Sequence, residues 1–286
     1  MASSDLRPMS LGEVLDRTFT LYKNNFWLFA GIMSLPLLLL FFVQVGIAAM
    51  STANRTLAGT AVAPATIITS AIVGGIVIFV VYIVMYGAAQ AATIFAVSDL
   101  YLGRTASVRG SFARVRGNIL RALGVIFLTG LIVGVGFIAL IIPGLILLAR
   151  TAVAVPAAML EDKYAGEAVS RSMDLTKGYA MQTFLIFLLV WVLSIVVAAI
   201  FQYPFLFIMV GAAAKHQAVS FTYLLLQHLA SFIASVLIGP IATIAFSLMY
   251  YNLRVRKEAF DIQHLIASLP TGSQPVPPVP GAPSAA

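Results

Sequence analysis

The sequence predicts an all-α, polytopic integral membrane protein with six transmembrane helices, and three observations support this fold class. Hydrophobic residues make up 61% of the 286 residues and charged residues 9%, whereas a soluble domain carries roughly a quarter charged residues. The charges leave five uncharged runs of 28 to 43 residues, and about 20 apolar residues suffice to cross a bilayer. The third observation is the unequal distribution of lysine and arginine between the two sides of the predicted membrane domain. A soluble globular fold is therefore excluded, and the lack of cysteine excludes disulfides and thiol chemistry.

Five of the six helices follow directly from the uncharged runs. A formal charge at mid-bilayer is costly, so transmembrane helices fall between the charges. Within the predicted third span, Gly130 and Gly134 have the spacing that is typical of close helix packing. The five predicted spans are Phe26–Met50, Ile67–Val97, Ala122–Ile142, Tyr179–Val210 and Phe221–Tyr251.

The remaining candidate span, Gly144–Leu160, has 17 residues, contains Arg150 and follows a Pro143-Gly144 break. Its length alone fits either a short span or a segment at the membrane surface. If it crosses, 14 lysines and arginines lie on one side of the membrane and two on the other, whereas otherwise the split is 9 against 7. Because cytoplasmic loops carry an excess of these residues, we predict that it crosses and that both termini are cytoplasmic.

Three cytoplasmic segments are predicted to form amphipathic helices on the membrane surface. The first begins with a capping box, in which the side chains of Ser10 and Glu13 satisfy each other's backbone amides. The third, over residues 166–178, spaces Glu167 and Arg171 for an i,i+4 ion pair. Both segments precede a predicted span, so each would lie where the chain enters the membrane.

The second amphipathic segment carries the predicted membrane-surface residues. Four arginines flank an apolar stripe that falls within about 60° on a helical wheel. A basic helix of this kind suits the level of anionic headgroups on the cytoplasmic side, so membrane lipids are the predicted partners. Nucleic acid is not, because the sided distribution accounts for the net charge of +7. The stripe consists of Val108, Phe112, Val115 and Ile119, and the arginines are Arg109, Arg114, Arg116 and Arg121.

The first and third amphipathic segments share a pattern at a constant offset of 154 residues. In the second, Gly110 and Arg121 keep the spacing of 11 that separates the outer matches of the other two. We infer a threefold repeat of one surface helix and one membrane hairpin, with chance similarity between basic helices as the alternative. The matches pair Gly12, Glu13, Arg17, Leu21 and Lys23 with Gly166, Glu167, Arg171, Leu175 and Lys177.

Several stretches of the chain resemble a known family. They are LRPMSLGEVLDRTFTLYKNNF, IPGLILLARTAVAVPAAMLED with GEAVSRSMDLTKG after it, and YYNLRVRKEAFDIQHL. In them the chain, from about Leu6 to Leu265, resembles the glycerophosphoryl diester phosphodiesterase membrane-domain family of bacterial six-span proteins. The resemblance implies a six-span fold in the bacterial cytoplasmic (plasma) membrane. It does not imply hydrolysis, because we expect the soluble catalytic domain of some family members to be absent here.

The chain divides into a six-helix transmembrane domain over residues 1–268 and a tail over residues 269–286. The tail holds six of the 13 prolines and has almost nothing to bury, so we predict a disordered cytoplasmic segment. A proline-rich docking ligand is the alternative.

Arg150 is the most informative single residue, because a guanidinium cannot lose its charge to escape a low dielectric. No carboxylate lies at a comparable depth, so its partners are expected among backbone carbonyls, glutamines, lipid phosphate or a ligand. A structural role and an anionic-ligand role both fit. The predicted ligand-binding set is Arg150, Gln90 and Gln202. Gln44 is the third glutamine expected as a candidate partner of Arg150.

No motif predicts catalysis. The three histidines, His216, His228 and His264, lack partners at zinc-ligand spacing, and no phosphate-binding loop or dinucleotide fingerprint occurs. The adjacent carboxylates Glu161 and Asp162 fit a solvated helix end, with an ion or headgroup site as the alternative. We therefore expect no catalytic residues, no metal and no cofactor.

The leading functional hypothesis is a non-catalytic membrane module that binds or passes lipid-like molecules, or organises a membrane partner. An oligomer is compatible with it. A competing hypothesis is a small-molecule transporter whose site lies at the kinked spans, and a third is a phospholipid-processing enzyme. The prolines expected to kink the spans are Pro36, Pro156, Pro204 and Pro240.

Overall fold

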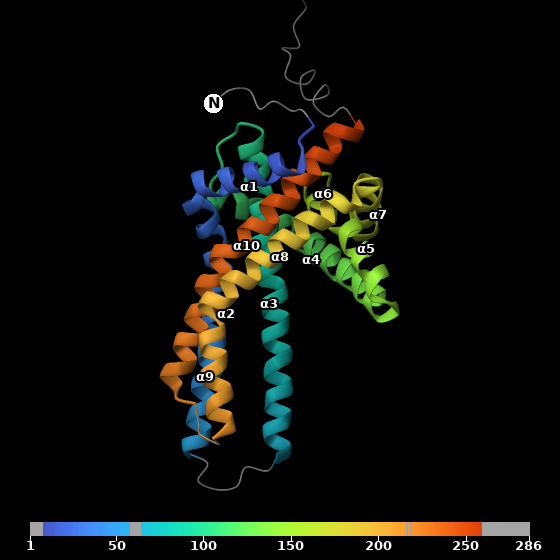
Figure 1. Ribbon diagram of the computed structural model, residues 1–286. Helices are drawn as coiled ribbons and strands as arrows, with labels where there is room; N and C mark the ends of the chain where they lie inside the picture. The colour runs from blue at the N-terminus through green and yellow to red at the C-terminus, as the bar shows by residue number, and fades with distance from the viewer. Residues whose placement is uncertain (1–7, 58–63, 216, 218, 259–286) are drawn as a thin grey trace, which may run out of the picture.

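The computed structural model describes residues 8–57, 64–215, 217 and 219–258, and in these ranges the chain forms helices joined by short connections, with no strand (Figure 1). The all-α prediction is confirmed. The helices are α1 (Leu11–Asn24), α2 (Phe26–Leu57), α3 (Pro64–Tyr101), α4 (Val108–Ala139), α5 (Ile141–Thr151), α6 (Ala154–Leu160), α7 (Ala165–Thr176), α8 (Ala180–Phe201), α9 (Tyr203–Ala214) and α10 (Phe221–Glu258). The predicted tail, residues 269–286, lies outside the described residues.

Six segments of the described chain are long and apolar enough to cross a membrane, which confirms the predicted number of spans. The helices α2, α3, α4, α8 and α10 each provide one. The remaining segment, Ile141–Leu160, combines α5 and α6 and has a mean hydropathy of 1.9. The stretch for which length alone was ambiguous therefore belongs to a candidate span.

This fourth span is a broken helix, and its breaks differ from the predicted one. Extended backbone at Leu140, with φ −167° and ψ 157°, separates α4 from α5, while Pro143 lies in the first turn of α5. Proline is tolerated there because the first amides of a helix have no intrahelical acceptor. A second break at residues 152–153 precedes α6, which is buried on all sides from Ala154 to Met159. Protein therefore surrounds α6, and it contacts α3, α4, α7 and α10.

The turn between α4 and α5 brings two glycines into close contact. A Cβ atom added to Gly136 would lie 3.0 Å from the Cα of Gly144, and one added to Gly144 would lie 2.6 Å from the ring of Phe137. The prediction for Gly130 and Gly134 is wrong within the described chain, because an added Cβ would meet nothing within 4 Å at either residue. The close packing of α4 against α5 thus depends on Gly136 and Gly144.

The prediction of a separate surface helix over residues 108–121 is also wrong, because they begin the 32-residue helix α4. Ser107 caps it, and its Oγ accepts a hydrogen bond of 3.1 Å from the amide of Gly110. The apolar stripe exists but packs against the protein core rather than the bilayer: Val115 is buried, and Val108, Phe112 and Ile119 contact the core. Helical periodicity identifies a face to be buried without identifying what covers it.

The other two amphipathic segments form α1 and α7, which likewise pack on the transmembrane helices. The capping box is confirmed, since the amide of Ser10 donates to Glu13 Oε2 at 2.7 Å and the amide of Glu13 donates to Ser10 Oγ at 3.3 Å. The first residues of α1 and α7, Leu11 and Ala165, are 154 residues apart, which is the offset of the sequence matches. Because α4 continues into its span without a break, the threefold repeat stays a prediction.

The fifth predicted span is divided at Gln202 into α8 and α9. Pro204 lies in the first turn of α9, where its missing amide donor costs little. In contrast, Pro36 and Pro240 lie inside α2 and α10. Figure 1 shows α9 extending toward the end of the molecule that is farthest from α1 and α7.

Candidate functional site

The end of the molecule that holds α1, α7, the first turns of α4 and the last turns of α10 is called the basic end (Figure 1). The lysines and arginines of these elements gather at this end, which agrees with the predicted split of 14 against two. Both limits of the described transmembrane chain meet at this end, because the amide of Met9 donates to Asn252 Oδ1 at 2.8 Å and Arg256 donates to the carbonyl of Met9 at 2.6 Å. The basic end is therefore where a charged ligand or surface would be met.

One face of α4 changes from basic to apolar along its length. At 100° per residue, Arg109, Arg116, Leu120 and Phe127 fall within about 40° of one another. The two arginines are exposed, and within the described ranges neither has a hydrogen bond or an ion pair. The side chains that follow are apolar and also exposed, at 81% for Leu120 and 71% for Phe127. An exposed apolar surface of this kind is suited to lipid chains, and the two arginines lie at its border nearest the basic end.

The other two predicted membrane-surface arginines are used inside the protein. Arg114 Nη2 donates to Asp99 Oδ1 at 2.7 Å, which ties α4 to the end of α3. Arg121 Nη1 donates to Asp162 Oδ1 at 2.5 Å, and its guanidinium lies 5.3 Å from the centre of the Tyr164 ring. The four predicted arginines therefore divide into two paired with protein carboxylates and two directed outward.

A second group of charges joins α6, α7 and α10. Glu161 Oε2 accepts a hydrogen bond of 2.9 Å from Arg171 Nε, and its Oε1 accepts one of 2.9 Å from the hydroxyl of Tyr250. Glu258 pairs with Arg171 and, at 3.0 Å, with Arg254. Burial opposes the charge on Arg171, but hydrogen bonds and attraction from Glu161 and Glu258 outweigh it and raise the pKa of Arg171.

Two expectations about these residues are corrected. The predicted ion pair between Glu167 and Arg171 does not form, because Glu167 Oε2 instead accepts from the amide of Tyr164 at 3.3 Å and caps α7. The predicted solvated helix end is right for Asp162, whose side chain is 80% exposed, but not for Glu161, whose side chain is 13% exposed. Buried carboxylates need charged or hydrogen-bonding partners, and α7 and α10 provide them.

Arg150 lies in the last turn of α5 and contacts the C-terminal turn of α7. Its Nη2 donates to the carbonyl of Met173 at 3.1 Å, and its own carbonyl accepts from Ser172 at 2.8 Å and Thr176 at 3.1 Å. Lys257 donates to the carbonyl of Asp174 in the same turn. Two cations from other helices thus stabilise the negative end of the α7 dipole. A backbone carbonyl was among the partners expected for Arg150, whose Nε is buried without a partner in the described chain.

The structure does not bring the predicted ligand-binding set together. Neither Gln90 nor Gln202 makes a side-chain hydrogen bond to Arg150 within the described ranges. Gln202 follows the 22 residues of α8, which at 1.5 Å per residue is about 33 Å from the start of that helix near the basic end. His228 lines a cleft far from Arg150, and His216 and His264 lie outside the described residues. No three His, Cys, Asp or Glu side chains are grouped for a metal in the part of the chain that the structure describes.

Sequence reasoning missed the residues that complete the charge group at the basic end. Tyr250, Arg254 and Glu258 are spaced at i, i+4 and i+8, so they share one face of α10. That spacing in a polar helix end was a usable signal. The partners on α6 and α7 had no comparable local signal, because Glu161 and Arg171 meet through the fold.

Six apolar helical segments with a basic end define a polytopic α-helical membrane protein. A comparison of the chain with protein-family models, with curated proteins and with solved structures found no match. The resemblance to the glycerophosphoryl diester phosphodiesterase membrane-domain family therefore remains a prediction from the sequence stretches given above.

Proposed function

We propose that the protein is a non-catalytic membrane module whose basic end binds anionic lipid headgroups on the cytoplasmic side of a bacterial plasma membrane. The observation that carries the proposal is the outward face of α4. Arg109 and Arg116 are exposed there without partners among the described residues, directly before the exposed Leu120 and Phe127. A cation placed where a lipid-facing helix leaves the hydrocarbon lies at the level of phosphate groups.

Exposed aromatic residues at the same end support this placement. Trp27, in the first turn of α2, is 84% exposed, and Tyr164, just before α7, is 69% exposed. Tryptophan and tyrosine are enriched at membrane–water interfaces because their rings are apolar with one polar group. Their positions at the basic end fit an interface that also passes between Arg116 and Leu120.

The family resemblance implies a six-span fold and a membrane location, and it agrees with this proposal. Four other roles remain hypotheses from the sequence. They are passage of lipid-like molecules, organisation of a protein partner or oligomer, transport of a small molecule, and phospholipid processing. Among the described residues, the unpaired arginines favour headgroup binding over these.

Native mass spectrometry of the protein from nanodiscs of equal phosphatidylcholine and phosphatidylglycerol tests the proposal. We expect the wild type to retain phosphatidylglycerol preferentially. In the Arg109→Gln/Arg116→Gln variant, the ratio of bound phosphatidylglycerol to bound phosphatidylcholine should fall about two-fold or more. The single variant Arg116→Gln should also weaken the preference for phosphatidylglycerol. Its matched control is Lys215→Gln, which removes one exposed positive charge at the opposite end and should keep the preference. An unchanged preference in the double variant would overturn the proposal.

A further inference from the structure

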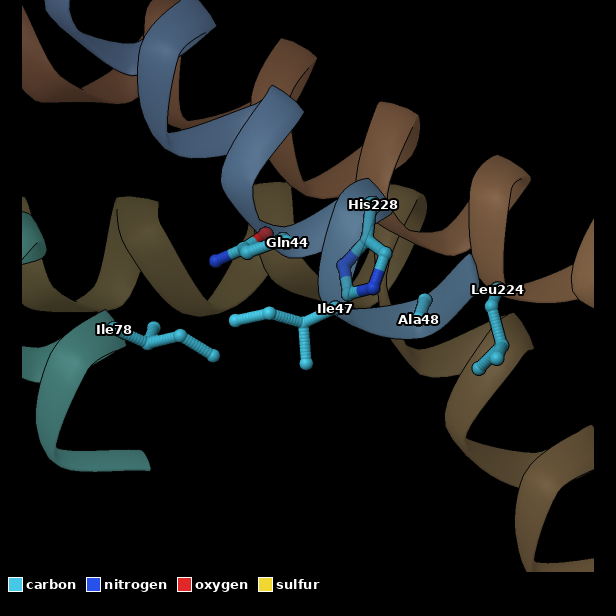
Figure 2. Close-up of a pocket in the computed structure, with 6 residues that line it drawn as sticks. All are labelled: Gln44, Ile47, Ala48, Ile78, Leu224 and His228. Carbon is cyan, nitrogen blue, oxygen red and sulfur yellow. The ribbon is translucent and has the colours of Figure 1, made fainter. Parts of the chain in front are cut away.

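A cleft of about 300 Å³ opens between α2, α3 and α10, well away from the basic end (Figure 2). Figure 2 shows its side chains gathered from three helices around one space. The lining residues are Gln44, Ile47, Ala48, Ile78, Leu224 and His228. The volume is at the lower limit of small-molecule sites and suits one polar group with part of an alkyl chain.

The cleft lies well inside the ends of two candidate membrane spans. Gln44 is six residues before the end of the span Phe26–Met50, and His228 is seven residues after the start of the span Phe221–Glu258. At 1.5 Å per residue, both positions are about 10 Å inside the ends of their spans. Water does not reach lipid-facing surfaces at this depth, so polar side chains there need partners from the protein or from a ligand.

Gln44 and His228 have no such partner in the part of the chain that the structure describes. Each can donate and accept a hydrogen bond. The other four lining residues are apolar, and no lining residue carries a formal charge. The site therefore offers hydrogen bonds to an uncharged polar group and an apolar wall to a hydrocarbon chain.

We propose that this cleft binds the uncharged polar end of an amphiphile from the bilayer, a hydroxyl group that donates to one of Gln44 and His228 and accepts from the other. The attached alkyl chain packs against Ile47, Ile78 and Leu224. The site is separate from the headgroup-binding surface of α4, and neither depends on the other.

Photolabelling in phosphatidylcholine nanodiscs tests the proposal. The probe is a long-chain primary alcohol with a diazirine in its alkyl chain, and labelled peptides are located by mass spectrometry. We expect labels in α2 and α10 on the peptides that contain Gln44 and His228. Dodecan-1-ol should compete with the probe, whereas dodecane, which lacks the hydroxyl, and dodecanoate, which is charged, should compete less. Equal competition by dodecane or by dodecanoate would overturn the proposal.

Variants separate hydrogen bonding from folding. Gln44→Leu and His228→Leu should each lower labelling about five-fold, as expected for loss of one hydrogen bond. His228→Gln keeps a donor and an acceptor and should restore labelling. Gln227→Leu is the matched control, because Gln227 is adjacent on α10 but does not line the cleft.

The midpoint of thermal unfolding is measured for every variant. Full labelling of Gln44→Leu and His228→Leu at an unchanged midpoint would overturn the proposal, as would a loss of labelling in His228→Gln with an unchanged midpoint. The Arg109→Gln/Arg116→Gln variant should keep its alcohol labelling, so failure of the headgroup proposal is distinguishable from failure of this one.

Discussion

The side chain of Asn252 holds both backbone polar groups of Met9. Its Oδ1 accepts from the Met9 amide at 2.8 Å, and its Nδ2 donates to the Met9 carbonyl at 3.1 Å, although 243 residues separate the two. Both residues are buried, at 1% and 4% exposure. The bonds fix the segment before α1 to the last turns of α10.

Asn252→Leu should therefore destabilise the protein by about 1 to 3 kcal/mol, because it leaves the buried amide of Met9 without its acceptor, while Arg256 still donates to the Met9 carbonyl. The measurement is the midpoint of thermal unfolding in detergent. Asn118→Leu is the control, since its Nδ2 donates to the carbonyl of Arg114 at a solvent-exposed site. Equal midpoints for the two variants would show that the Met9 contact contributes nothing.

Glu161→Gln should cost about 3 kcal/mol, because it leaves the partly buried Arg171 with one carboxylate instead of two. Asp162→Asn provides the adjacent comparison. Its side chain is 80% exposed, so loss of its pair with Arg121 should cost less than about 1 kcal/mol. Chemical unfolding of both variants measures the difference, and the idea fails if Asp162→Asn is the more damaging change.

Gly144→Ala should destabilise the protein by about 1 to 3 kcal/mol, because its Cβ would lie 2.6 Å from the ring of Phe137. Gly130→Ala should leave stability unchanged or raise it slightly, since nothing lies within 4 Å of the added Cβ. Thermal unfolding of the two variants in the same detergent gives the comparison. A stable Gly144→Ala protein would contradict the close α4–α5 contact.

Arg150→Met should lower stability by about 1 to 2 kcal/mol, because it removes the bond to Met173 and a cation at the end of the α7 dipole. Arg150→Lys keeps the charge and should lose less. Native mass spectrometry then separates structure from binding. Loss of bound anionic lipid from folded Arg150→Lys protein would favour the ligand role over the structural one.

Accessibility of single cysteines tests the proposed orientation, and the cysteine-free sequence makes this direct. Thr52 lies near the end of α2 and Ser107 at the start of α4, at opposite ends of the molecule. In whole cells, an impermeant thiol reagent should label Thr52→Cys and not Ser107→Cys. The reverse pattern would place the basic end outside.

The sequence predicts those parts of the structure that depend on local chemistry. Uncharged runs locate the spans because charges are excluded from hydrocarbon, and Ser10 with Glu13 locates the start of α1 because a capping box forms within one turn. Partners distant in sequence were not predictable. Periodicity could not show that the Val115 face packs on protein, and spacing could not show that Arg171 selects Glu161 over Glu167.

The same limit applies to the candidate site. Charge and residue type identified all four arginines of the second amphipathic segment alike. Only the fold determines that Arg114 and Arg121 pair with carboxylates of the described chain, whereas Arg109 and Arg116 do not. Gln44 and His228 come from α2 and α10, and only the packing of these helices places them on one cleft.

The enclosure of α6 imposes an order on biogenesis. This short helix contacts α10, the last helix of the described chain, and the adjoining Glu161 accepts a hydrogen bond from Tyr250. Until α10 is synthesised, one flank of α6 is uncovered and Glu161 lacks its hydrogen bond from Tyr250. We therefore expect maturation to wait for α10, and nascent chains stalled before it should be the preferred targets of membrane quality-control proteases.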